Sequence, residues 1–304
     1  MFRLAHISDI HLGPLPPVTR RELASKRITG YLNWRRNRKD AMADGSLETL
    51  VSHMLANTPD HVAVTGDLIN LALKEEIRLA RAWLERVGEP RDVTVVPGNH
   101  DTYVRGAQAD FTKAWWPYLV GDSDATSNPF PSLRRRGNVA LIGVNSGRVS
   151  LPFYATGTFG RTNEAATSKL LQEAAADGAY RVVMIHHPPF PKATASHKRL
   201  IGATRFRDMI EREGADLVLH GHTHVVSHET IAGPGGVRVP VIGVPSASAA
   251  PRVGINANHE SKRPAGRYNL FEIDHGNGRS TCRWAEYGYA DGETEVSLIE
   301  SRVL

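Results

Sequence analysis

The segment 93–101 reads Val93-Thr94-Val95-Val96-Pro97-Gly98-Asn99-His100-Asp101. Its first half is short, apolar and rich in β-branched valine, which predicts a buried strand. Its second half becomes polar at once, and the glycine gives the backbone the freedom to turn sharply after the strand. Ligands of layered α/β proteins gather where the strands end, so the asparagine, histidine and aspartate are candidates for a functional site.

The same pattern recurs along the chain. Further buried strands are predicted at Phe2–Ile7, His61–Val64, Val139–Val144, Val182–Ile185, Leu217–Leu219 and Val239–Val244. Polar clusters follow five of the runs, at Asp9-Ile10-His11, Gly66-Asp67, Gly98-Asn99-His100-Asp101, His186-His187-Pro188 and Gly221-His222-Thr223-His224. Each cluster alone has an ordinary explanation, since Gly-Asp is a common turn and paired histidines are often solvated. Five clusters in order, each after a predicted strand, indicate one shared site.

Helical patterns between these strands complete the expected core. They begin near residues 46, 73, 163 and 204, and the alternation of strand and helix predicts a layered α/β fold. Near the C-terminus, Asn269–Ile273 and Thr281–Tyr287 flank the turn residues 275–278, which predicts a hairpin, and Val296–Val303 predicts a last strand.

We therefore expect a single domain over residues 1–304. Its core covers residues 1–250 and contains a basic insertion at 14–45. The strands of 251–304 are too few to fold alone, so we expect them to complete a second sheet of the same domain.

Composition limits the classes of function. The chain has 304 residues, 41% of them hydrophobic and 23% charged, as in an ordinary globular protein with a sizeable core. A formal charge of +5 suits anionic substrates, but the sequence has no strong signal for nucleic-acid binding. A single cysteine, Cys282, excludes an internal disulfide and a thiolate metal cluster. Together with an N-terminus without the apolar core of a signal peptide, this favours a cytoplasmic location.

The clusters offer carboxylate, imidazole and amide groups, a set that suits first-row ions such as manganese, iron, cobalt, nickel or zinc. Residues two apart on an extended segment point the same way, so Asp-x-His and His-x-His can each aim two ligands into one cleft. Seven ligands are too many for one tetrahedral site and suit two ions that share a carboxylate. The candidate metal ligands are Asp9, His11, Asp67, Asn99, His186, His222 and His224.

On these motifs the chain resembles the calcineurin-like metallophosphoesterase superfamily, from the first Asp-x-His to the last Gly-His-x-His. The resemblance implies a two-sheet β-sandwich flanked by helices, with two ions (manganese, iron or zinc) at its edge. It implies that one ion is held by Asp9, His11, Asp67 and His224, and the other by Asp67, Asn99, His186 and His222. Asp67 and a hydroxide would then bridge the ions. The family spacing His-x-Pro selects His186 rather than His187.

The same resemblance implies a dinuclear phosphoesterase mechanism. The bridging hydroxide attacks phosphorus in line, and His100 protonates the leaving oxygen or stabilises the transition state. Asp101 is the second candidate catalytic residue, either as the partner that orients His100 or as a helix N-cap.

The branch that the chain resembles most contains bacterial class III cyclic-nucleotide and glycerophospho-diesterases. We therefore expect a phosphodiesterase that acts on small soluble diesters, with cyclic nucleotides among the candidates. The alternatives are a phosphomonoesterase and a hydrolase of lipid-linked pyrophosphates at the membrane surface, although that last branch usually has arginine in place of His100. The intact ligand set argues against a non-catalytic scaffold.

The insertion at 14–45 has three interpretations. Over its whole length it contains eight basic residues, all between 20 and 39, and three acidic ones, Glu22, Asp40 and Asp44; Ile28, Tyr31, Leu32 and Trp34 lie among them. It is either a structural element, a lid that attracts the phosphate, or a membrane contact through residues 19–39. Arg35 and Arg36 are its candidate substrate contacts, and His197 is a third candidate elsewhere in the chain. The sequence leaves the oligomeric state open.

Overall fold

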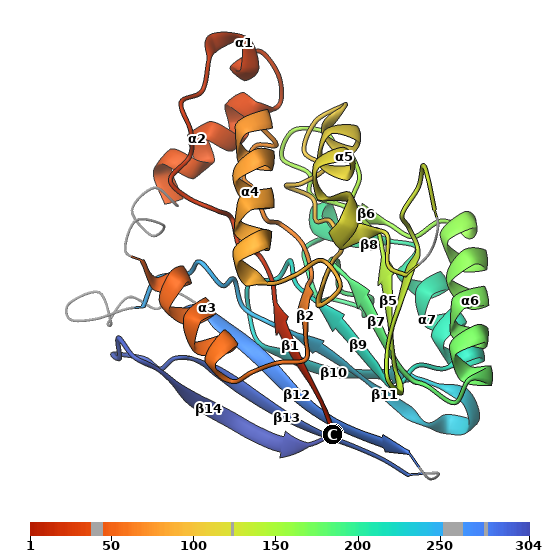
Figure 1. Ribbon diagram of the computed structural model, residues 1–304. Coiled ribbons are helices and arrows are strands. Elements are labelled where there is room, and N and C mark those ends of the chain that lie inside the picture. The colour runs from red at the N-terminus through yellow and green to blue at the C-terminus, as the bar shows by residue number, and fades with distance from the viewer. Residues whose placement is uncertain (38–44, 123–124, 252–263, 277–278) are drawn as a thin grey trace.

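The computed structural model describes residues 1–37, 45–122, 125–251, 264–276 and 279–304, which form two facing sheets with helices on their outer sides (Figure 1). In the described part of the chain each sheet has six strands. The first has the order β14 (Val296–Val303), β13 (Arg279–Tyr289), β12 (Arg267–Gly276), β1 (Phe2–Ile7), β2 (His61–Val64) and β3 (Val93–Val95). The second has the order β10 (Ser227–Ala232), β11 (Arg238–Gly243), β9 (Leu217–His220), β7 (Tyr180–Ile185), β5 (Val139–Val144) and β4 (Ser132–Arg136).

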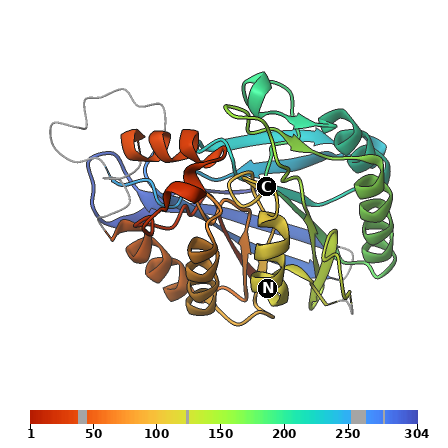
Figure 2. The same ribbon diagram turned by 90° about the horizontal axis from the view of Figure 1, so that it is seen from above.

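Two sets of helices cover these sheets, and the view from above shows them on different sides of the molecule (Figure 2). The first set is α3 (Ser46–Ala56), α4 (Lys74–Val87) and α5 (Ala107–Leu119), whose apolar residues belong to the same core as the first sheet. The second set is α6 (Arg161–Ala176) and α7 (Ala203–Glu213), which pack on the outer side of the second sheet. Short elements complete the fold: α1 (Arg20–Leu23), α2 (Arg27–Asn37), the 3₁₀ turns η1 (Ser196–Lys198) and η2 (Pro234–Gly236), and the parallel pair β6 (Gly157–Thr158) and β8 (Leu200–Ile201).

The central strands of the second sheet are buried on both faces. In β7, Val182 and Met184 belong to the core between the sheets, whereas Val183 and Ile185 belong to the cluster under α6 and α7. Side chains alternate between the two faces of a strand, so a strand covered on both sides needs apolar residues at every position. This explains why continuous valine and isoleucine runs, rather than alternating ones, marked the strands in the sequence.

The central strands run parallel within each sheet. β1, β2 and β3 are parallel neighbours, as are β5, β7, β9 and β11. Their carboxyl ends therefore lie at one edge of each sheet, and the loops that carry the five polar clusters leave from there.

The seven strands predicted from apolar runs are all present, each with ends within two residues of the prediction. Two edge strands, β4 and β10, and the helix α5 were not predicted. β4 is Ser-Leu-Arg-Arg-Arg and lies at the rim of its sheet, where charged residues are tolerated because one side of the strand is unpaired. α5 carries Pro117 near its end, a residue that argues against a helix in a sequence pattern.

The C-terminal strands β12, β13 and β14 belong to the sheet that also contains β1, β2 and β3. β12 pairs antiparallel with β1, so both ends of the chain contribute to the first sheet. Residues 252–263 and the turn residues Asn277 and Gly278 lie outside the described residues.

The insertion forms two short helices. The break falls at residues 24–26, between α1 and α2, and Gly30 lies inside α2. A side chain at Gly30 would collide with Tyr103 and Leu71, so glycine allows α2 to approach the body of the protein closely. Arg38 and Lys39 lie outside the described residues. No helix in the described ranges is both long and apolar enough to cross a membrane.

Candidate metal centre

The fold brings the predicted ligands together at the carboxyl ends of β1, β2, β3, β7 and β9. Ligand atoms within 4.8 Å of one another form overlapping groups, among them Asp9 with His11 and His224, and Asp9 with Asp67 and His186. Asp67 Oδ2 lies 3.9 Å from His11 Nε2 and 3.4 Å from His186 Nε2. One carboxylate oxygen therefore faces histidines on both sides, as a bridging ligand must.

Backbone strain is concentrated in this centre. Five of the seven candidate ligands have φ between 41° and 71°, a region that residues other than glycine seldom adopt. Such conformations cost free energy and persist where the surrounding structure enforces them, which is typical of functional sites. The five residues are Asp9, His11, Asp67, His222 and His224. Glycines allow the loops to approach one another, since a side chain at Gly98 would collide with the carboxylate of Asp67.

Backbone carbonyls fix the orientation of three of the histidines. His11 Nδ1 lies 3.2 Å from the oxygen of Ile69, and His186 Nδ1 lies 2.6 Å from the oxygen of Thr65. His222 is turned the other way, with Nε2 2.9 Å from the oxygen of Lys198. A carbonyl only accepts, so each of these nitrogens carries the proton. The opposite nitrogen is then a metal-binding lone pair, an arrangement common around protein metal sites.

The side-chain oxygens of Asn99 and Asp9 are also placed as metal ligands would be. Asn99 Oδ1 is buried and has no hydrogen-bond partner within the described ranges. A buried acceptor without a partner is costly, and a cation would satisfy it. Asp9 uses Oδ2 to accept hydrogen bonds from Ser8 Oγ at 2.8 Å and from the His222 amide at 2.9 Å. Its Oδ1 points toward His224 Nε2, 3.0 Å away.

The electrostatics of the centre favour positive charge. Burial alone would raise the pKa of Asp67, but His186 and His100 beside it hold that pKa well below its ordinary value. Burial alone would lower the pKa of His186, but the carboxylate of Asp67 raises it to about 9. His222 behaves differently, because burial and the charge of His186 lower its pKa to about 3. The negative charge of the carboxylates thus stabilises a protonated His186, and bound metal ions would be stabilised by the same negative charge.

His187 has a different environment from its neighbour. Its Nδ1 lies 2.8 Å from Ser146 Oγ, and its Nε2 lies 3.2 Å from the oxygen of Ala155. Both ring nitrogens are thus engaged within the fold, although the ring is close to His186 and His222. This geometry favours His186 as the ligand and gives His187 a role in holding the loop before β6.

Asp101 has neither of its two expected roles, the helix N-cap and the partner that orients His100. It does not cap a helix, because α5 begins only at Ala107 with Gly106 as its N-cap. It does not orient His100 either. Its buried carboxylate accepts four backbone N–H bonds, from Gly98 and Asp67 at 2.8 Å, Leu68 at 2.9 Å and Ile69 at 3.3 Å. Asp101 therefore ties together the loops after β2 and β3, which carry two of the ligands. Burial and the charge of Asp67 raise its pKa to about 7.

His100 is held by other groups. Its Nδ1 lies 2.6 Å from the oxygen of Asn70, and its backbone N–H donates to Asp67 Oδ1 at 2.7 Å. Its ring meets His11 edge-on, with centroids 4.8 Å apart, and stacks on Tyr103 at 5.5 Å with an angle of 4° between the planes. Sequence reasoning missed Tyr103. An aromatic residue two positions after the motif was the only available signal.

The candidate substrate contacts lie outside the cluster of metal ligands. Arg35 and Arg36 are exposed on α2, and the guanidinium of Arg35 lies 6.0 Å from the ring of Tyr31 on the same helix. His197 is exposed in η1, next to Lys198, whose carbonyl orients His222. The structure thus places His197 beside the centre and places both arginines on the insertion.

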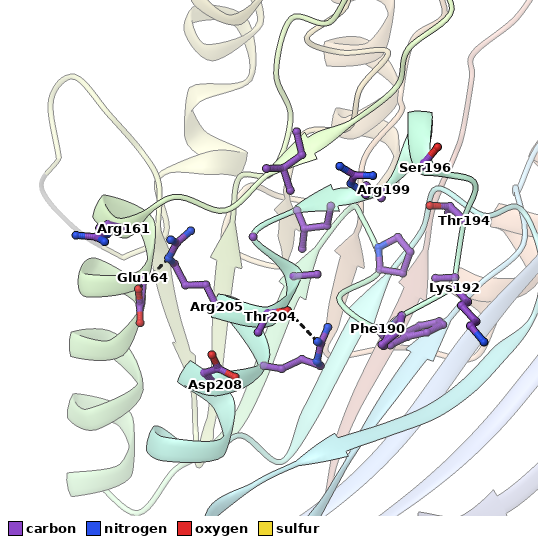
Figure 3. A pocket seen from close by; sticks show the side chains of 18 residues that line it. Arg161, Glu164, Phe190, Lys192, Thr194, Ser196, Arg199, Thr204, Arg205 and Asp208 are labelled. Carbon is purple, nitrogen blue, oxygen red and sulfur yellow. Dashed lines mark hydrogen bonds and ion pairs between the residues drawn. The ribbon is translucent and has the colours of Figure 1, made fainter.

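A cavity of about 970 Å³ adjoins the His186-His187-Pro188 loop (Figure 3). It lies between residues 188–199 and the start of α7, and its lining contains more basic than acidic side chains. Figure 3 shows Arg205 paired with Glu164, at 3.3 Å, whereas Arg199 lies on the side of β8. No local sequence pattern indicated this cavity, because its lining residues are scattered between 161 and 208. Its basic residues are Arg161, Lys192, Arg199, Arg205 and Arg207, and its acidic residues are Glu164 and Asp208.

The protein has two facing β-sheets flanked by helices, and carboxylate, imidazole and amide ligands surround a shared aspartate at their edge. These features define a metal-dependent hydrolase with a dinuclear centre. The model of one family, described as calcineurin-like phosphoesterase, matches residues 2–226, and the chain belongs to this family.

Individual relatives are more distant. The chain is 24% identical over 230 residues to the glycerophosphodiester phosphodiesterase GpdQ of Enterobacter lignolyticus (strain SCF1), which covers 73% of this chain and 70% of that one. The fold of the present chain is similar to that of a dimetal phosphatase from Danio rerio, with a TM-score of 0.59 and 14% identity. The match covers 99% of this chain and 98% of the phosphatase chain. The fold is also similar to that of the purple acid phosphatase PPD1 of yellow lupin, with a TM-score of 0.58, 12% identity, and coverage of 99% and 53%.

Proposed function

We propose that this calcineurin-like phosphoesterase is a phosphodiesterase that hydrolyses small soluble phosphodiesters, with cyclic nucleotides among the candidate substrates, and that it uses two ions of manganese, iron or zinc. The observation that carries the proposal is the position of Asp67 Oδ2 between His11 and His186, with His100 beside them. The diesterase activity of the curated relative supports the substrate class.

The residues divide between two ions around the shared Asp67. Asp9, His11 and His224 would hold one ion, and Asn99, His186 and His222 the other. When bound, such ions lower the pKa of an attacking water and neutralise the charge that develops on the phosphoryl oxygens. The protein presents these ligands already oriented, because carbonyls and buried amides fix their side chains.

His100 is the proposed proton donor to the leaving oxygen. The Asn70 carbonyl and the Asp67 carboxylate hold its ring and backbone, and the stack on Tyr103 restricts its rotation. The ring is partly exposed, unlike the buried ligands. A substrate bound at the centre can therefore reach it.

Charge around the centre supports an anionic substrate. The lining of the 970 Å³ cavity has five basic and two acidic side chains, which raises the local concentration of anions. We also propose a cytoplasmic location, since the lone Cys282 is a buried free thiol and the described fold needs no disulfide.

The test is a substrate panel with the metal-loaded enzyme. It compares bis(p-nitrophenyl) phosphate, p-nitrophenyl phosphate, cyclic nucleotides, glycerophosphodiesters and UDP-linked lipids. We expect kcat/KM for the diesters to exceed that for the monoester, and Asp67→Asn to abolish both activities. A clear preference for p-nitrophenyl phosphate would replace the proposal with a phosphomonoesterase.

A further inference from the structure

Exposed apolar side chains gather on two segments next to the metal centre. Six of the twelve large apolar residues that are exposed in the described part of the chain belong to these segments. Two lie on α2, and four lie on the loop between β5 and β6. They are Ile28 (49% exposed), Leu32 (46%), Val149 (44%), Leu151 (71%), Phe153 (82%) and Tyr154 (50%). We call these six residues the apolar rim.

Lys26 joins the two segments. It lies just before α2, and its Nζ donates hydrogen bonds to Ser150 Oγ at 2.9 Å and to the oxygen of Tyr154 at 3.1 Å. The same Nζ lies 4.4 Å from the ring of Tyr103, which stacks on His100. In Figure 1, α1 and α2 stand at the end of the molecule where β1 and β2 finish. The apolar rim is therefore beside the metal centre, connected to it through Lys26 and Tyr103.

Phe153 combines high exposure with a strained backbone. Its φ is 66°, in the left-handed region that bulky residues rarely adopt. A side chain that is 82% exposed gains little from packing that would offset this strain. Large apolar side chains exposed together in this way are typical of an interaction surface.

The charge of the same region identifies the chemistry of the partner. Residues 14–37 and 147–160 contain seven arginines and lysines and one acidic residue, Glu22. On α2 the exposed positions 28, 32, 35 and 36 follow helical spacing, so isoleucine and leucine share one face with two arginines. An anionic lipid bilayer matches both properties, because apolar side chains enter the boundary between headgroups and acyl chains while arginines attract anionic headgroups.

We infer that the apolar rim, with Arg20, Arg21, Arg35, Arg36 and Arg148 around it, docks this protein onto an anionic membrane surface. Docking holds the metal centre at the headgroup layer, where phosphoesters of lipids lie. The inference about docking stands apart from the proposed function and does not depend on which phosphoester the centre hydrolyses.

The experiment is co-sedimentation of the full-length, metal-loaded protein with vesicles. Vesicles of phosphatidylcholine alone are compared with vesicles of phosphatidylcholine mixed with phosphatidylglycerol. We expect binding to the mixed vesicles that weakens as salt rises, because salt screens the arginines. The double variant Leu151→Ser/Phe153→Ser should bind roughly tenfold more weakly, since it no longer inserts two large apolar side chains.

A matched control separates docking from a general loss of exposed apolar residues. Val237 and Val303 are also well exposed, at 62% and 66%, but lie near β11 and on β14. The variant Val237→Ser/Val303→Ser should bind vesicles as the parent does. Turnover of bis(p-nitrophenyl) phosphate, followed in parallel, shows that each variant is folded and tests the proposed function separately.

Three outcomes would overturn the inference: no binding of the parent protein to mixed vesicles, equal binding by the Leu151/Phe153 variant, or an equal loss in the control. Concentration-dependent dimerisation that the Leu151/Phe153 variant abolishes, without vesicle binding, would assign the surface to a second copy of the chain instead. Vesicle binding without diester turnover would reject the proposed function and leave the docking inference intact.

Discussion

Replacement of Asp101 by asparagine tests what holds the metal centre together. The carboxylate accepts N–H bonds from Gly98 and Asp67 on one oxygen, and from Leu68 and Ile69 on the other. Asparagine has nearly the same shape but only one oxygen. Whichever way its amide is turned, an NH₂ group faces two backbone donors, and two of the four hydrogen bonds are lost.

The magnitude follows from these contacts. A buried donor left without an acceptor costs about 1–3 kcal/mol, so two of them cost about 2–6 kcal/mol. Natural domains are stable by only about 5–15 kcal/mol, so this is a large share of the total. A chain of this size loses roughly 2–4 °C of Tm for each kcal/mol, and we expect a decrease of roughly 5–20 °C. The loops after β2 and β3 would also shift, which should weaken metal binding roughly 10–100-fold.

The assay combines thermal unfolding with elemental analysis. Unfolding of the metal-loaded and chelator-treated Asp101→Asn variant gives the stability of each form, and elemental analysis after dialysis gives the ions per chain. Turnover is then expressed per bound ion. Asp110→Asn is the matched control, because Asp110 is exposed on α5 and its replacement should change stability by no more than about 0.5 kcal/mol.

A particular pattern would refute this account. If Asp101→Asn kept its Tm and both ions, and lost turnover only with poor leaving groups, the residue would act on proton transfer through His100. The hydrogen bonds to the backbone would then be incidental.

Four further predictions concern other parts of the molecule. Asp67→Asn should lose turnover and at least one ion per chain, and elemental analysis that finds two ions with near-normal activity would contradict the bridge. His100→Gln should keep both ions and lose roughly 10²–10⁴ in kcat with poor leaving groups but less with p-nitrophenolate, whereas equal losses would indicate a purely electrostatic role. Arg35→Gln with Arg36→Gln should raise KM for an anionic diester and flatten its salt dependence if residues 14–45 act as a lid, and an unchanged KM and salt response would exclude that role for these arginines. Burial lowers the pKa of His61 in the fold, and its unfolded value is about 6.5, so the unfolded chain takes up the proton first as pH falls. The free energy of unfolding should therefore decrease as the pH drops below about 6.5, by up to about 1.4 kcal/mol per pH unit for this residue. In denaturant titrations at several pH values, His61→Gln should reduce this dependence on pH. An equal pH dependence in the variant and the parent would contradict the prediction.

The sequence by itself determined the layered core and the composition of the centre. Central strands buried on both faces need apolar residues at every position, and this signal is local and strong. The polar clusters were equally visible, because each follows directly on such a strand. The order of strand ends along the chain was enough to place all seven candidate ligands in one region.

Only the tertiary structure decided how the ligands are held. Backbone carbonyls orient the rings of His11, His186 and His222. Because every residue has a backbone carbonyl, no sequence pattern indicates which carbonyls accept these hydrogen bonds. Asp101 illustrates the same limit. Its neighbours in the chain suggested a partner for His100, whereas its actual partners lie mainly in a loop 32 to 34 residues earlier.

Pairing between distant segments was also beyond the sequence. The hairpin of β12 and β13 was recognisable from its own residues, but its place beside β1 depends on contacts across more than 260 positions. The edge strands β4 and β10 lack a strong apolar pattern because they are only partly buried. Lys26 likewise reaches Ser150 across 124 positions to connect the insertion with the loop after β5. Local patterns report how deeply a segment is buried, and only the folded chain determines which segments meet.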